Sequence, residues 1–246
     1  MQGLTRTAFS GPALVRLLAQ FADLDVHEPA QSLSDRLSQW LGWTNAIALS
    51  TALSAEPPAV AGARSTAGDE EAASARTRSR LVSAVTHDES SGKHARGRHR
   101  AAVQTPPDDM QIEYAIFRQH YLSLQQTMES DIGELRGRLR AAVASRSADL
   151  TRLAVVDAVM EQTLAARERS LLAQVPVMLG RHFERLKRAH ARRVDETQAA
   201  ADAAVPAPAP GAWLAAFRKD MQSVLLAELE VRFQPVEGLL AALRTQ

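Results

Sequence analysis

The sequence predicts an all-α protein with a short N-terminal helical unit, a disordered linker, a long antiparallel helical hairpin or coiled coil, and a C-terminal amphipathic helix. The strongest support comes from residues 108–197, which contain one proline and few glycines. Apolar residues there recur in steps of four and three, which places them on one face of a helix. The first run comprises Phe117, Tyr121, Leu124, Met128, Ile132, Leu135, Leu139 and Ala142. The pattern returns at Leu150, Leu153, Val156, Met160 and Leu164, and then at Leu171, Val175, Leu179, Phe183 and Leu186.

The composition also favours helices. Apolar residues make up 46% of the 246 residues, but aromatic residues only 4%, which suits helix seams better than a sheet core. The net charge of +1 argues against a chain that binds polyanions through its overall charge. The sequence has no cysteine, which excludes disulfides and thiolate metal sites and fits a reducing compartment. No segment has the pattern of a signal peptide or the roughly 20 apolar residues of a membrane span, so we expect a cytoplasmic, soluble protein.

Residues 1–53 are predicted to form a compact unit of three short helices. The first covers Ala13 to Asp23 and has Leu14, Leu17, Leu18 and Phe21 on one face. The second follows Pro29, and the third begins near Thr44, a capping residue. Together they could bury Trp40 and Trp43. A unit of roughly fifty residues is marginally stable alone, so we expect it to pack on another surface.

Residues 54–107 are predicted to be a disordered linker. Prolines, alanines, glycines, serines and an acidic run give this segment too little apolar surface to order itself. A short helix between Ala75 and Val85 is the one exception that the pattern allows. A dense cationic run follows at residues 93–100.

The hairpin, residues 108–197, is expected to begin at Asp108 as the N-cap and to turn between Ser145 and Asp149, with Ser147 capping the second arm. Pro176 should kink that arm or start a third helix near Val175. Gly133 and Gly137 weaken the first arm by about 1 kcal/mol each relative to alanine, unless they allow a close approach of helices.

The C-terminal part consists of a Pro/Ala linker, residues 198–211, and a helix in residues 212–246. The prolines between residues 206 and 210 favour a stiff, extended spacer. The helix should run from Ala212 to Phe233 and be interrupted by Pro235. Its apolar side consists of Trp213, Phe217, Met221, Val224, Leu225 and Leu229. This side is apolar enough to require a partner surface, either the hairpin or another chain.

The chain resembles an uncharacterised family of proteobacterial proteins that is classed as a domain of unknown function. The resemblance is carried by Phe9–Pro12 (FSGP), Leu14–Leu18 (LVRLL), Leu33–Trp43 (LSDRLSQWLGW), and the later segments Phe183–Leu186 and Arg188–His190. It covers most of the chain and is weakest in the middle linker. Members tend to be encoded beside stator-like channels and outer-membrane-protein-A-like proteins. The resemblance therefore implies an accessory role in a cell-envelope assembly, and it implies no catalytic residues.

We find no catalytic, cofactor or metal motif in the sequence, and therefore expect a protein that is not an enzyme. His94 and His99 stand among arginines, and His182 and His190 lack the spacing of a helical metal clamp. We expect these histidines to be solvated. The serines are explained by caps, turns and linkers, and Ser90–Lys93 lacks the spacing of a phosphate-binding loop.

The residues predicted to bind a partner are Trp40 and Trp43 together with the basic residues Arg181, Arg185, Arg188 and Arg192. The first hypothesis is a helical scaffold or adaptor that associates with itself or with another helical protein. The alternative is a basic helical protein that binds nucleic acid through phosphate contacts. The basic runs are not interleaved with aromatic residues for base stacking, and they lack the large apolar residues that membrane insertion needs. A basic face that pairs with acidic residues of a neighbour is therefore the preferred interpretation.

Overall fold

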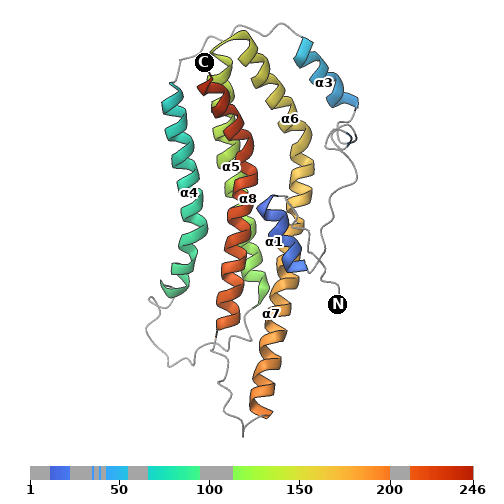
Figure 1. The fold of residues 1–246 in the computed structure, drawn as a ribbon, viewed down its shortest axis with the longest axis vertical. Coiled ribbons are helices and arrows are strands. Elements are labelled where there is room, and N and C mark those ends of the chain that lie inside the picture. Colours follow the sequence, from blue (N-terminus) through green and yellow to red (C-terminus); the bar gives the residue numbers. More distant parts are fainter. Residues whose placement is uncertain are drawn as a thin grey trace, which may run out of the picture.

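The computed structural model consists of helices and contains no strand among the residues it describes (Figure 1). Those residues are 12–22, 35, 39, 43–54, 66–94, 113–199 and 211–245. The helices are α1 (Ala13–Ala22), α3 (Trp43–Ser54), α4 (Ala67–His94), α5 (Tyr114–Ala144), α6 (Ala148–Leu172), α7 (Gln174–Ala199) and α8 (Ala212–Arg244). The predicted all-α fold is confirmed.

The long helices form one bundle around α5 and α8, which lie side by side and run in the same direction (Figure 1). Helix α4 packs against both from one side and runs the opposite way, as its ion pairs show. Glu71 near its start meets Arg244 at the end of α8, and Arg78, about two turns later in α4, meets Glu237, about two turns earlier in α8. Helices α6 and α7 follow each other on the other side and run antiparallel to α5.

The predicted apolar faces of α5 and α8 are confirmed as the core of the bundle. From Tyr121 to Ala142 every residue of the predicted α5 stripe is buried, and Phe117 packs against the core while partly exposed. All six residues of the predicted α8 face are buried as well. Each helix covers the apolar face of the other, so the C-terminal helix finds its partner surface within the chain.

The hairpin turn is where the spacing predicts it. Helix α5 ends at Ala144, and the hydroxyl of Ser147 caps α6 by accepting from the backbone N–H of Leu150, with 3.3 Å between the two atoms. The predicted cap Asp108 lies outside the described residues, and α5 begins at Tyr114 instead. Pro176 is the third residue of α7, where a missing backbone N–H costs nothing because the first turn has no partner for it.

Pro235 does not interrupt α8, contrary to the prediction. The helix continues to Arg244, although a proline inside a helix costs about 3 kcal/mol or more. Buried residues on both sides of the proline, including Phe233, Val236 and Leu239, hold the last turns against α4 and α5. Packing therefore offsets the lost backbone hydrogen bond.

The prediction that residues 54–107 form a disordered linker is wrong for α4, which contains the short helix expected between Ala75 and Val85 but is longer at both ends. This helix begins with a reciprocal cap: the Asp69 N–H donates to the Thr66 hydroxyl, and the Asp69 carboxylate accepts from the Thr66 N–H. These bonds with Thr66 lower the pKa of Asp69. Leu81 and Val85 are buried in the shared core. The alanines and serines that suggested a solvated segment instead let α4 approach the bundle closely.

The predicted N-terminal unit is not a compact domain in the part of it that the structure describes. Helix α1 packs against α7 and α8, whereas α3 packs against α6 (Figure 1). The apolar face of α1 is confirmed, since Leu14 and Phe21 are buried and Leu17 and Leu18 are partly buried. Trp40 lies outside the described residues, and so does the side chain of Trp43, the first residue of α3.

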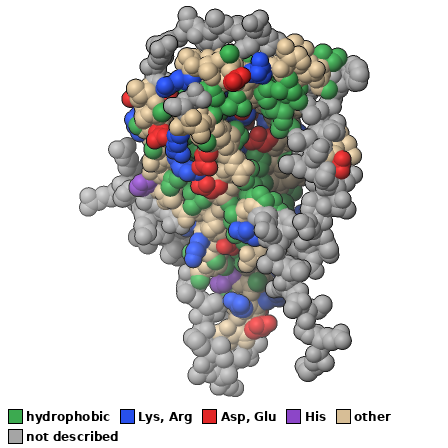
Figure 2. Space-filling model, turned by 45° about the horizontal axis from the view of Figure 1, so that its top comes forward, with side chains coloured by type: hydrophobic (Ala, Val, Ile, Leu, Met, Phe, Trp, Pro, Cys, Tyr) green, Lys and Arg blue, Asp and Glu red, His purple; other side chains and the backbone are tan. Residues whose placement is uncertain are grey.

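Helix α6 departs from its predicted stripe. Its buried residues are Leu150, Thr151, Ala154 and Leu172, while Leu153 is 40% exposed. Charged residues hold α6 to α5 instead: Arg136 and Arg140 on α5 pair with Asp157 and Glu161 on α6. In Figure 2, hydrophobic side chains gather toward the upper end of the bundle with acidic and basic ones beside them.

The assignment of α4 to the core gives a direct prediction. Leu81 is 2% exposed, so Leu81→Ala should lower the free energy of unfolding by about 3 kcal/mol through lost burial and a residual cavity. Chemical denaturation followed by circular dichroism measures this change. Ser83→Ala, on the exposed side of the same helix, serves as the control and should change it by less than about 0.5 kcal/mol. Equal, small effects of both substitutions would place α4 outside the core.

Candidate functional site

A groove between the start of α5 and the length of α7 brings the predicted basic residues together. Arg181, Arg185, Arg188 and Arg192 all line it, because steps of four, three and four keep them on one face of α7. Arg118 from α5 adds a fifth guanidinium. The groove encloses about 1100 Å³. We call it the arginine groove; its other lining residues are Tyr114, Pro176, Val177, Gly180, Glu184, Ala191 and Asp195.

The arginine groove carries an excess of positive charge. Five arginines face two carboxylates, those of Glu184 and Asp195. Within the described part of the chain, the ion pairs found involve none of the five groove arginines. Guanidinium groups present fixed, planar sets of donors that match carboxylate and phosphate oxygens in pairs. The groove therefore presents donors that suit an anionic group.

At Gly180 the backbone of α7 lies directly against the Tyr114 ring of α5. A Cβ atom at this position would lie 2.9 Å from the ring of Tyr114, so a larger residue would push α7 away from α5. The Tyr114 hydroxyl donates to the backbone carbonyl of Pro176. Burial raises the pKa of this hydroxyl to about 12. Gly133 and Gly137 do not allow a close approach of two helices. A Cβ atom at Gly133 would meet nothing within 4 Å, and one at Gly137 would meet only an arginine side chain.

Aromatic packing fixes α7 behind the groove. The ring of Phe183 lies at the centre of a cluster, with centroids 5.0 Å from Phe217, 5.2 Å from Trp213, 5.7 Å from Tyr114 and 5.8 Å from Phe117. The contacts to Phe217 and Trp213 are edge-to-face, the arrangement that aromatic quadrupoles favour. Five of the eleven aromatic residues of the chain thus meet where α5, α7 and α8 join. The cluster keeps the arginine-bearing face of α7 turned outward.

His182 is buried, contrary to the expectation of a solvated histidine. Its Nε2 lies 2.7 Å from a carboxylate oxygen of Asp220, and its Nδ1 lies 2.9 Å from a terminal nitrogen of Arg185. Because arginine has no acceptor, Nδ1 accepts that bond and Nε2–H donates to Asp220. The ring of Phe21 on α1 stacks on the imidazole at 4.4 Å. His182 therefore joins α1, α8 and one groove arginine.

The structure also contributes residues that sequence reasoning missed. Arg118 and Asp220 reach this region from α5 and α8, and local spacing on α7 gives no signal for either. Within the described residues, no group of three or more histidine or acidic side chains is placed to hold a metal ion. Trp43 opens α3, which packs against α6, so the structure does not bring it together with the α7 arginines through these helices.

The chain belongs to the family described as "Protein of unknown function (DUF3348)", whose model matches residues 1–245. No curated protein and no solved structure matches the chain. The family match confirms the expected membership in a family of unknown function. Of the helices described, none has an apolar stretch long enough to cross a membrane.

The two tyrosines of the chain give a pH prediction. Burial raises the pKa of Tyr114 to about 12, and burial, followed by the charge of Glu228, raises the pKa of Tyr121. The folded protein therefore keeps protons that the unfolded chain loses from about pH 10, so the free energy of unfolding should fall as pH rises from about 10 toward 12. Tyrosinate absorbance at about pH 11 should be weak in the native protein and strong in denaturant. Equal absorbance in both states would contradict the burial of these hydroxyls.

Proposed function

We propose that this DUF3348 protein is a non-enzymatic helical adaptor whose arginine groove binds an acidic helical segment of another protein. The observation that carries the proposal is the convergence of five arginines in one groove, outside the ion pairs that hold the bundle. Similar guanidiniums elsewhere in the chain are used internally: Arg136, Arg140 and Arg232 each pair with two carboxylates. The groove arginines are placed to do the same for a partner.

The lining of the groove favours a protein segment over nucleic acid. Val177 and Ala191 add apolar surface, and Val177 is 48% exposed. An amphipathic helix can cover such surface and present carboxylates every three or four residues to the arginines of α7. Tyr114 is the one aromatic residue among the groove lining described, and its ring packs at Gly180, where it cannot stack on a base. Glu184 and Asp195 would repel a continuous phosphate backbone.

The chemistry of the groove supports binding rather than catalysis. An arginine side chain stays protonated under all conditions in which the protein is folded, so it cannot take up or release a proton in a reaction. The family resemblance suggests where the partner comes from: an acidic segment of a cell-envelope assembly that contains stator-like or outer-membrane-protein-A-like components. Association with a second copy of the chain is the other form of the adaptor hypothesis.

Nucleic-acid binding is the second candidate, and the excess of positive charge in the groove is the observation that favours it. A phosphate backbone would bind with a steep salt dependence and with little regard to sequence. An acidic helix would also lose affinity in salt, so the salt dependence alone does not distinguish the two ligands. A direct comparison of the two does.

The test is a titration of the full-length protein against a fluorescent acidic amphipathic peptide longer than about 15 residues, so that it can be helical. Arg192→Glu should weaken binding by about tenfold, equivalent to about 1.4 kcal/mol, because one attractive contact becomes repulsive. Arg193→Glu makes the same charge change one residue away, outside the groove lining, and should weaken binding less than about threefold.

Single-stranded DNA and a basic peptide of the same length are the comparison ligands. The adaptor proposal predicts that the acidic peptide binds more tightly than the DNA and that the basic peptide does not bind. Tight DNA binding that Arg192→Glu abolishes, without binding of the acidic peptide, would favour the nucleic-acid candidate. Binding of neither ligand at low salt would overturn both.

A further inference from the structure

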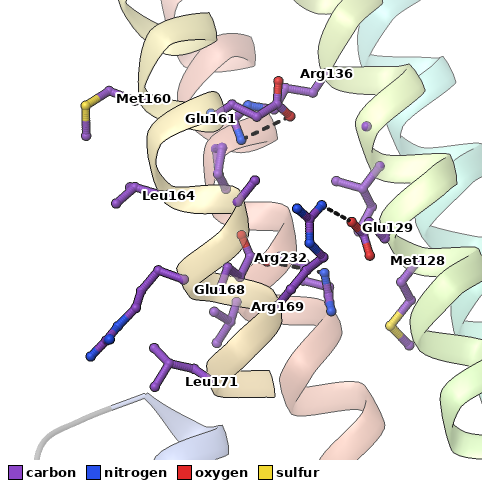
Figure 3. A pocket seen from close by; sticks show the side chains of 16 residues that line it. Met128, Glu129, Arg136, Met160, Glu161, Leu164, Glu168, Arg169, Leu171 and Arg232 are labelled. Atoms are coloured by element: carbon purple, nitrogen blue, oxygen red, sulfur yellow. Dashed lines mark hydrogen bonds and ion pairs between the residues drawn. The ribbon is translucent and has the colours of Figure 1, made fainter. Parts of the chain in front are cut away.

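A second hollow lies between α5, α6 and α8, separate from the arginine groove, and encloses about 360 Å³ (Figure 3). We call it the three-helix cleft. Its apolar wall comes from all three helices and consists of Met128 and Ile132 on α5, Met160 and Leu164 on α6, and Val231 and Pro235 on α8. Its volume is at the lower end of the range for small-molecule sites.

The cleft exists because α6 stands away from α8. Leu164 and Met160 line the cleft and are only partly buried, whereas Met128 on α5 is 1% exposed. Gly133 adds to the open space, since a Cβ atom built there would meet no heavy atom within 4 Å. A well-packed bundle leaves few voids larger than a water molecule, so a hollow of this size requires an explanation.

Three ion pairs join residues that line the cleft on different helices. Figure 3 shows them as contacts of α6 with its two neighbours. Arg169 lies 3.1 Å from Glu129 on α5, and Arg136 of α5 lies 3.5 Å from Glu161. The third pair joins Glu168 to Arg232 of α8 at 3.2 Å. A cleft of about 360 Å³ is too small for an α-helix about 10 Å wide, but it has room for an unbranched chain.

The charges around the cleft determine the polarity of its ligand. Four arginines line the cleft, and three of them, Arg136, Arg169 and Arg232, each have a carboxylate partner in the same lining, so an anionic head group would meet a carboxylate beside each of these three cations. The Arg232 side chain is 7% exposed, its Nε donates to Glu228 and its Nη1 donates to Glu168. Neither bond uses Nη2. With two carboxylates already beside this arginine, a neutral oxygen is a better third acceptor than another anion.

We propose that the three-helix cleft binds a single-chain neutral amphiphile, with its aliphatic chain between Met128 and Met160 and its hydroxyl or carbonyl oxygen accepting from Nη2 of Arg232. Methionine side chains are flexible and polarisable, and they adapt to a slender apolar ligand. The chain would cover the apolar residues that the distance between α6 and α8 leaves unpacked. This binding is independent of the arginine groove.

The test is a titration of the full-length protein with decanol, followed by NMR of methyl-labelled methionine. The Met128 and Met160 signals should shift together and saturate, while Met221, buried in α8 away from the cleft, should not move. Gly133→Leu would fill the cleft and should weaken binding at least tenfold. Gly238→Leu is the matched control, because its Cβ also meets nothing within 4 Å but it does not line the cleft. If Gly133→Leu does not fold, Ala165→Leu blocks the opposite wall.

Three outcomes would overturn the proposal. The first is a uniform shift of all methionine signals, or equal effects of Gly133→Leu and Gly238→Leu, which would indicate non-specific partitioning. The second is binding of decanoate or decyltrimethylammonium as tight as that of decanol, which would contradict the preference for a neutral head group. The third is capture of the protein by phosphatidylcholine vesicles without any binding of free decanol.

Arg192→Glu should leave decanol binding unchanged, so failure of the groove and failure of the cleft are distinguishable.

Discussion

The packing of this protein depends on a carboxylate that has no contact with solvent. Glu228 lies on the seam between α5 and α8, 0% exposed, and accepts from the Tyr121 hydroxyl at 2.7 Å, from Gln125 at 3.0 Å and from Arg232 at 2.9 Å. A buried charge costs several kcal/mol unless it is paired and hydrogen-bonded. Helices α5 and α8 therefore have one favourable position relative to each other, the one in which these donors meet Glu228.

The other helices are added to this central pair in different ways, and the two candidate sites follow from the difference. Helix α7 is held by aromatic packing around Phe183 and by the contact of Gly180 with Tyr114, so it lies close and its arginines face outward. Helix α6 is held mainly by ion pairs, and the space beside it remains open as the three-helix cleft. Arg232 connects the core to the cleft, since it contacts both Glu228 and Glu168.

Periodicity in the sequence was sufficient for some helices and not for others. It predicted the buried faces of α5 and α8, because residues such as Leu124 and Leu225 repeat at helical spacing over many turns. It failed for α6, because spacing shows which residues share a face but not how near the next helix lies. For α4 it indicated only the short helix from Ala75 to Val85, because the composition of the flanking residues favoured a solvated linker. Glu228 lies at the spacing of the apolar α8 residues, and a charged residue at such a position can indicate a buried carboxylate in the sequence alone. The arginine face of α7 was predictable, whereas its neighbour Arg118 required the fold.

The most direct test of the central claim is the free energy of unfolding of Glu228→Met, measured by urea denaturation. Methionine has nearly the shape of glutamate but accepts no strong hydrogen bonds, so Tyr121, Gln125 and Arg232 would keep buried donors without their acceptor. If this network fixes α5 against α8, the substitution should lower the free energy of unfolding by about 3–5 kcal/mol. A loss below about 1 kcal/mol, or a gain, would contradict the claim and show that apolar packing alone holds the two helices together.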